Sequence, residues 1–179
     1  MTVLVAAKEG NKLVLASDRL VTMQWHLAGE TTKLFKKRGF IFAGSGTWRD
    51  IQIVMNRLTV PPRNEDHSVD SYVFDVAEAI RDLMKSYDRD GKPKDMDASF
   101  LMINKDGIWM ISNDYSIVHS NDFLVQGYGS NVVLGAYRAL QPHVIDIEER
   151  CRTAIEITNV NTLYCGKGVD IEVIELDLT

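Results

Sequence analysis

The sequence has little cysteine, little proline and no long apolar run. Two cysteines, Cys151 and Cys165, in 179 residues exclude a disulfide framework and a four-cysteine zinc site. The longest apolar runs, Val3 to Ala7 and Ile108 to Ile111, are far shorter than the ~20 residues of a membrane span. The chain shows no basic leader of a secretory signal, so we expect a cytoplasmic protein without membrane partners.

The charge balance is acidic and contains no basic stripe. The chain has 25 acidic and 20 basic side chains, a net charge of -5, which argues against a nucleic-acid partner. Apolar residues make up 45% and charged residues 25%, values typical of a globular domain that can bury a core. The length predicts one domain that spans residues 1–179.

Turn residues and apolar periodicity divide the chain into short strands and four helices. Residues 19–30 are expected to be irregular, and the strands between 98 and 126 are expected to form a meander. Ser68 is a predicted cap for the second helix and Thr47 for the first. Strands are predicted over 2–7, 13–18, 31–35, 40–43, 98–104, 107–112, 116–119, 122–126 and 171–178, and helices over 48–58, 69–87, 131–141 and 146–158.

This order of elements is strands, two helices, strands, two helices and a final strand. Two antiparallel sheets can bury one face on each other and the opposite face under a helix pair. The sequence therefore predicts an α+β fold, a four-layer αββα sandwich.

Thr2 is the first candidate for chemistry. If Met1 is removed, this one residue carries both a hydroxyl nucleophile and a free α-amine. The reference pKa of such an amine is about 7.7–8.0, so it can accept a proton near neutral pH. A retained Met1 would place the amine in a peptide bond and remove the base.

The opening of the chain resembles the N-terminal-nucleophile peptidases, specifically proteasome β subunits and their bacterial relative HslV. The matching segments are Thr2 to Ala6 and Leu13 to Asp18, with the family's acidic residue on Asp18. Lys33 in Thr32-Lys33-Leu34-Phe35 matches the family's catalytic lysine if this chain lacks one residue of the family in the irregular stretch before it. The resemblance implies an ammonium at Lys33 that eases ionisation of Thr2 and is held by Asp18. An ordinary surface ion pair is the alternative.

A glycine turn, Ala43-Gly44-Ser45-Gly46-Thr47, matches the family's oxyanion turn. Backbone N–H groups near a helix start are free to donate, so one of them could stabilise a tetrahedral oxyanion. Alignment with the family turn from Ala43 onward favours Gly44 as the oxyanion donor. Gly46 is the alternative if the turn carries an insertion relative to the family.

Other matches depart from the family. In Gly127-Tyr128-Gly129-Ser130, Tyr128 stands where the family has a serine that supports the amine. Thr162 replaces an aspartate and Cys165 replaces a second serine, changes that could weaken the support of the amine. Together, Tyr128, Gly129, Thr162 and Cys165 are the expected supporting residues.

The resemblance also implies two ligand sites. In the HslV branch, carbonyl groups at positions that match Asn159, Thr162 and Cys165 hold a monovalent cation, and an ordinary turn is the alternative. No cofactor is required. The wall of the substrate pocket matches Val21, Thr31, Phe35, Phe42 and Gly46, with Trp48 at its rim; packing against helices or a neighbouring subunit is the alternative for Phe42 and Trp48.

The resemblance implies a threonine-type endopeptidase subunit in homo-oligomeric stacked rings that cleaves polypeptides. The chain has no phosphate-binding loop of the ATPase type, so an ATP-dependent unfoldase would be a separate protein. Two alternatives stay open: a catalytically weak or inactive proteasome-like ring protein, and an N-terminal-nucleophile amidase that acts on a small molecule.

Overall fold

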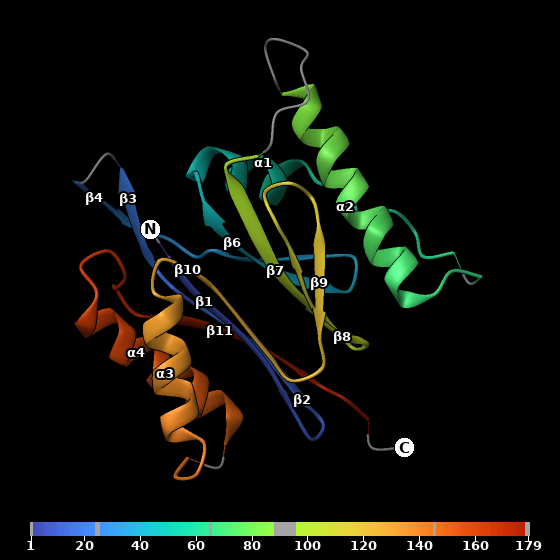
Figure 1. Ribbon diagram of the computed structural model, residues 1–179. Coiled ribbons are helices and arrows are strands. Elements are labelled where there is room, and N and C mark those ends of the chain that lie inside the picture. Colours follow the sequence, from blue (N-terminus) through green and yellow to red (C-terminus); the bar gives the residue numbers. More distant parts are fainter. Residues whose placement is uncertain (1, 24–25, 65, 88–95, 145, 178–179) are drawn as a thin grey trace.

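The computed structural model describes residues 2–23, 26–64, 66–87, 96–144 and 146–177. These residues form four layers, two antiparallel sheets with a helix pair on each outer face (Figure 1), which confirms the predicted αββα sandwich. The first sheet has the strand order β10-β1-β2-β11, the second β5-β6-β7-β8-β9, and β3 pairs with β4. The strands are β1 Val3–Glu9, β2 Lys12–Asp18, β3 Leu20–Met23, β4 His26–Glu30, β5 Leu34–Lys37, β6 Phe40–Gly46, β7 Ala98–Asn104, β8 Gly107–Ile111, β9 Ile117–Ser120, β10 Phe123–Gly127 and β11 Val169–Glu175; the helices are α1 Trp48–Arg57, α2 Val69–Ser86, α3 Ser130–Leu140 and α4 Ile147–Asn161.

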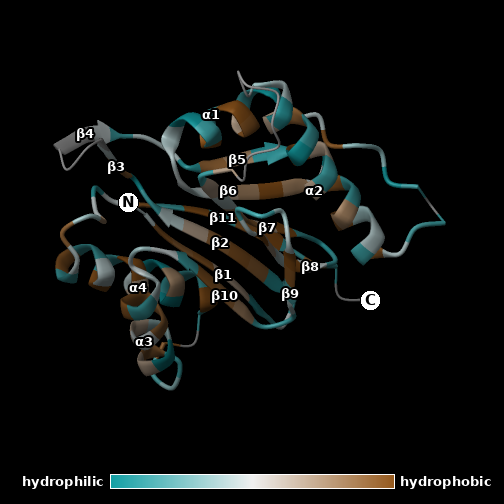
Figure 2. Ribbon diagram, turned by 45° about the horizontal axis from the view of Figure 1, so that its top comes forward, coloured by the Kyte–Doolittle hydropathy of each residue, from teal (hydrophilic) through white to brown (hydrophobic). Residues whose placement is uncertain are grey.

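The central hairpin β1–β2 is apolar on both faces because it lies between two layers. Successive side chains of a strand point to opposite faces. Val3 and Val5 therefore pack under α3 and α4, whereas Leu4 and Ala6 pack against the second sheet. Figure 2 shows hydrophobic residues along the strands between the two helix layers.

The second sheet buries its outer face under α1 and α2. On α2, the buried residues include Val73, Val76 and Ile80, which follow the three- and four-residue spacing of a helix face. The Ser68 hydroxyl accepts a hydrogen bond from Ser71 N, as predicted for the cap. Thr47 is the N-cap residue of α1, as predicted, but its side chain makes no capping hydrogen bond. No helix of the described residues has both the length and the apolar character needed to cross a membrane.

Three predictions of local structure were wrong. Residues 20–23 and 26–30 form the paired strands β3 and β4 rather than an irregular segment. The strand expected from residue 31 begins at Leu34, because the Thr32 hydroxyl accepts a hydrogen bond from Leu34 N in a local turn. The meander ends at β9, since β10 crosses to the first sheet and pairs with β1.

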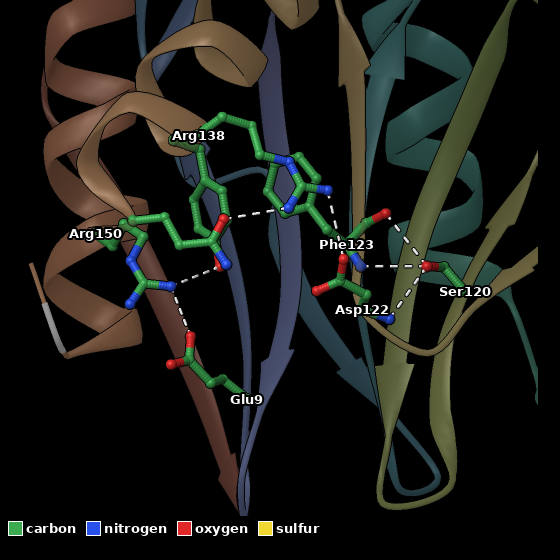
Figure 3. Close-up of polar contacts among 8 residues, drawn as sticks. Glu9, Ser120, Asp122, Phe123, Arg138 and Arg150 are labelled. Atoms are coloured by element: carbon green, nitrogen blue, oxygen red, sulfur yellow. Dashed lines mark hydrogen bonds and ion pairs between the residues drawn. The ribbon is translucent and has the colours of Figure 1, made fainter.

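Arg150 anchors α4 to the first sheet (Figure 3). Its buried guanidinium donates to Glu9 Oε2 at 2.6 Å and to the Tyr137 hydroxyl at 3.3 Å. It also donates to the Val144 carbonyl through Nε and Nη2. Arg138 on α3, in contrast, is half exposed and lies 3.4 Å from Asp122 on the surface.

We expect Arg150→Ala to destabilise the fold by about 2–4 kcal/mol, because it leaves the partly buried Val144 carbonyl without its donor and opens a cavity. Arg138→Ala is the matched control, with an expected loss below about 1 kcal/mol for a surface ion pair. Thermal unfolding of both variants at one fixed protein concentration measures the difference. Equal unfolding midpoints for the two variants would contradict this account.

Candidate active site

Asp18 joins three segments at one end of the sandwich. It is the last residue of β2, and its side chain is fully buried. Oδ1 accepts hydrogen bonds from Lys33 Nζ at 2.7 Å and from Val3 N at 2.9 Å. Oδ2 accepts one from Gly166 N at 3.2 Å. The carboxylate therefore fixes the start of β1, the residue before β5 and the loop before β11 relative to one another.

Lys33 is buried to the same degree, with 1% of its surface exposed. Burial lowers the pKa of Lys33 from its ordinary value, because the ammonium loses solvation. Asp18 opposes this effect and raises the same pKa through its charge and its hydrogen bond. A buried, paired ammonium with a lowered pKa is typical of a functional site rather than of a surface ion pair.

Thr2 lies directly beside this ion pair. It is 4% exposed, and its carbonyl accepts a hydrogen bond from Gly129 N at 3.4 Å. Thr2, Lys33 and Gly46 line one cavity of about 20 Å³, which is large enough to hold a water molecule. Met1, whose removal the chemistry needs, lies outside the described residues. The other residues that line the cavity are Leu20, Val21, Thr22, Trp48 and Ile51.

The two glycines of the oxyanion turn have different roles in hydrogen bonding. Gly44 N donates to the Lys33 carbonyl at 3.3 Å, so it is already engaged. Because N–H groups alternate along a strand, Gly46 N faces the same edge, beyond the first residue of β5. Gly46 N has no hydrogen-bond partner within the described part of the chain. The hydrogen bond of Gly44 N argues against the count that favoured Gly44, and Gly46 N is the better candidate for the predicted oxyanion donor.

The predicted supporting residues separate into two groups. Gly129 packs against the site, where an added Cβ would lie 2.6 Å from Thr158 Cγ2 and 3.2 Å from Cys165 Sγ. Burial raises the pKa of the Cys165 thiol, which makes it a poor nucleophile. Thr162 donates to the Thr158 carbonyl at 2.8 Å and ends α4. Tyr128 is 60% exposed and contacts the Tyr164 ring.

The predicted substrate-pocket residues also separate. Val21 and Trp48 line the cavity, whereas Thr31, Phe35 and Phe42 do not. Phe42 is fully buried in the core under α1 and α2, and the Phe35 ring stacks on it with centroids 5.1 Å apart. Phe42 therefore packs against the helices, which was the alternative given above, and its assignment to the pocket wall was wrong. Thr31 donates its N–H to the Arg19 carbonyl at 3.0 Å.

The cation site proposed at Asn159, Thr162 and Cys165 stays a prediction. These residues lie at the end of α4 and in the loop that follows, and Asn159 Nδ2 donates to the Gly168 carbonyl at 3.4 Å. Within the described ranges, no group of three or more His, Cys, Asp or Glu side chains could hold a metal ion.

Sequence reasoning missed Asp50, a carboxylate that is only 7% exposed in the first turn of α1. Its Oδ2 accepts a hydrogen bond from Asp97 N at 3.0 Å, a link across 47 residues. Acidic residues are common in the first turn of a helix because the helix dipole stabilises their charge there, so Asp50 alone does not indicate this longer contact.

Comparisons of sequence and of structure both find proteins similar to this chain over nearly its whole length. No family model matches the chain. The ATP-dependent protease subunit HslV of Campylobacter concisus is 26% identical over 180 residues, which cover 97% of this chain and 98% of that protein. The ATP-dependent protease subunit ClpQ of Bacillus pumilus is 24% identical over 184 residues, with 97% of each chain covered.

The solved structures share the whole fold. Thiobacillus denitrificans BPH, in a complex with epoxomicin, superposes with a TM-score of 0.84 at 18% identity over 98% of this chain and 99% of that one. Eukaryotic HslV from Trypanosoma brucei superposes with a TM-score of 0.74 at 20% identity over 97% and 99%. The chain is therefore similar over nearly its whole length to HslV and ClpQ protease subunits, and it shares the fold of these HslV-like structures.

Proposed function

We propose that this chain is a threonine-type peptidase subunit whose nucleophile is Thr2 after removal of Met1. One observation carries the proposal: Thr2, the buried Lys33 and Gly46, whose N–H has no partner among the described residues, line the same cavity. A nucleophile, a charge that favours its ionised form and a donor for the oxyanion are the three parts that acyl transfer requires.

The proposed reaction uses each group at one step. The free amine of Thr2 takes the proton of its own hydroxyl as Oγ attacks the peptide carbonyl. Lys33, held by Asp18 at 2.7 Å, lowers the cost of negative charge on Oγ. Gly46 N donates to the tetrahedral oxyanion. The protonated amine then gives its proton to the leaving amine, and water hydrolyses the acyl-enzyme.

The relatives support a peptidase subunit and suggest the wider assembly. Two of them are named as subunits of ATP-dependent proteases, and we propose homo-oligomeric rings that take polypeptides from a separate ATPase. The surface agrees with an oligomer, because Val160 and Leu163 at the end of α4 are 83% and 85% exposed. Large exposed apolar side chains that lie close together mark an interaction surface.

Intact mass before and after treatment with epoxomicin tests the nucleophile. We expect the loss of Met1 and then one adduct on Thr2, since the hydroxyl and the amine are both free. Thr2→Ala should form no adduct, and Thr153→Ala on the surface of α4 should react like the parent chain. A retained Met1, or a free Thr2 that never reacts, contradicts the proposal and favours an inactive ring protein.

The pH dependence of kcat/KM tests the role of Lys33. Burial lowers the pKa of Lys33, and this is the largest effect on it. Three groups oppose burial and raise the same pKa: Asp18 on β2, which has the strongest effect, Cys165 after α4 and Asp170 on β11. Asp18→Asn removes the strongest of these, so the pKa of Lys33 falls further and its ammonium is lost at lower pH. We therefore expect the alkaline limb of the profile to move to lower pH.

Asp170→Asn should shift the alkaline limb in the same direction but less, because Asp170 contributes less than Asp18. An alkaline limb that stays in place in both variants would show that Lys33 is not the group that titrates.

Solution size separates a ring subunit from a small-molecule amidase. We expect light scattering to give a mass many times that of one chain, and Leu163→Asp to lower it by placing a charge on the exposed apolar surface. Asn161→Asp adds the same charge nearby without removal of an apolar side chain and should keep the parent size. A monomer or dimer for the parent chain favours the amidase.

A further inference from the structure

The Gly46–Thr47 turn is pressed against one carbonyl of a distant segment. Thr47 N donates to the Asp97 carbonyl at 2.6 Å. An added Cβ on Gly46, which has φ +116°, would lie 2.2 Å from the same oxygen. The direction of Gly46 N therefore depends on where the Asp97 peptide lies.

Strand pairing alone does not fix the Asp97 peptide. β7 begins one residue later, at Ala98, and Met96 N donates to the Asn113 carbonyl at 3.2 Å on the other side. The remaining anchor is Asp50, whose Oδ2 accepts a hydrogen bond from Asp97 N at 3.0 Å. Asp50 N also donates to the Thr47 carbonyl at 3.1 Å. Asp50 thus closes a ring of hydrogen bonds through Thr47 and Asp97.

The Asp50 carboxylate is not used as a simple helix cap. A capping side chain accepts from an N–H group of its own helix, whereas the Asp50 Oδ2 bond goes to a residue outside α1. Burial of a carboxylate costs free energy unless hydrogen bonds and nearby positive charge offset it. Asp97 N supplies one hydrogen bond, Arg49 Nη1 lies 3.5 Å from Oδ1, and the helix N-terminus adds positive potential.

We propose that Asp50 is a positioning residue that, through the Asp97 peptide, holds Gly46 N–H toward the cavity beside Thr2. This inference rests on the proposed function, because the Gly46 N–H matters for catalysis only if an oxyanion forms there. Asp50 itself is not among the residues that line the cavity with Thr2, so it would act through the Asp97 peptide.

Steady-state kinetics with a fluorogenic peptide tests the proposal. Asp50→Ala should lower kcat by about 10²-fold, the scale of a misplaced oxyanion donor, and leave KM within about twofold. Asp50→Asn keeps an oxygen that can accept from Asp97 N and should recover most of kcat. Asp70→Ala, which removes an exposed carboxylate from the first turn of α2, is the matched control and should keep the parent kcat.

Binding of a peptide aldehyde separates positioning from a general loss of structure. Thr2 Oγ adds to the aldehyde carbonyl to give a hemiacetal whose oxygen occupies the oxyanion position, and the hydroxyl proton passes to the amine or to that oxygen. Asp50→Ala should weaken aldehyde binding by a factor similar to its loss of kcat. Unchanged aldehyde affinity together with a lowered kcat would overturn the proposal.

Hydrogen exchange gives a readout that does not need activity. In Asp50→Ala, the Thr47 and Asp97 amides should exchange faster, while amides in the β1–β2 hairpin keep the parent rates. If the parent chain cleaves no peptide, the proposed function fails, and this exchange pattern still decides whether Asp50 holds the turn. Unchanged exchange at Thr47 would overturn the positioning role.

Asp50→Glu covers the case in which Asp50→Ala does not fold. It keeps the charge but moves the carboxylate by one methylene, so the bond to Asp97 N cannot keep its length. We expect the same loss of kcat at unchanged KM and the same faster exchange at Thr47. Parent values of kcat and exchange in Asp50→Glu would overturn the proposal.

Discussion

The buried ion pair between Asp18 and Lys33 is the interaction on which the rest of the site depends. At 2.7 Å it lies where the two sheets and the loop before β11 meet. Because Asp18 also accepts from Val3 N, the same carboxylate sets where β1 begins and so where Thr2 lies. Loss of either partner would leave an unpaired buried charge and would displace Thr2, the proposed nucleophile, as well.

The position of this pair follows from the sandwich itself. β1 and β2 are covered on both faces, so their ends reach the cavity as rigid segments rather than as free loops. The second sheet brings Lys33, the residue before β5, and Gly46, the last residue of β6, to the same end. A site held by paired strands keeps its geometry better than one on mobile loops.

β1, β2 and α2 could be predicted from local patterns, because the two strands are apolar runs and α2 has the apolar spacing of a helix face. Asp18 and Lys33 were predicted from the resemblance to a known family, and their catalytic roles stay predictions. The pairing of β10 with β1 could not be predicted, since the side-chain pattern of β10 fits an edge strand of either sheet. Gly46 was preferred to Gly44 only once the hydrogen bond from Gly44 N to Lys33 was known. The contact from Asp50 to Asp97 spans 47 residues, and no local pattern encodes such a contact.

The energetics of the site favour chemistry over a purely structural role. An apolar pair of similar volume commonly replaces a buried ion pair at no loss of stability, so stability alone does not require one here. Burial lowers the pKa of Lys33 despite Asp18, so the ammonium is held at a cost in solvation. That cost is incurred beside the buried Thr2 and beside Gly46, whose N–H has no partner in the part of the chain that the structure describes. A scaffold protein would need none of the three, whereas a nucleophile with a forming oxyanion needs all of them.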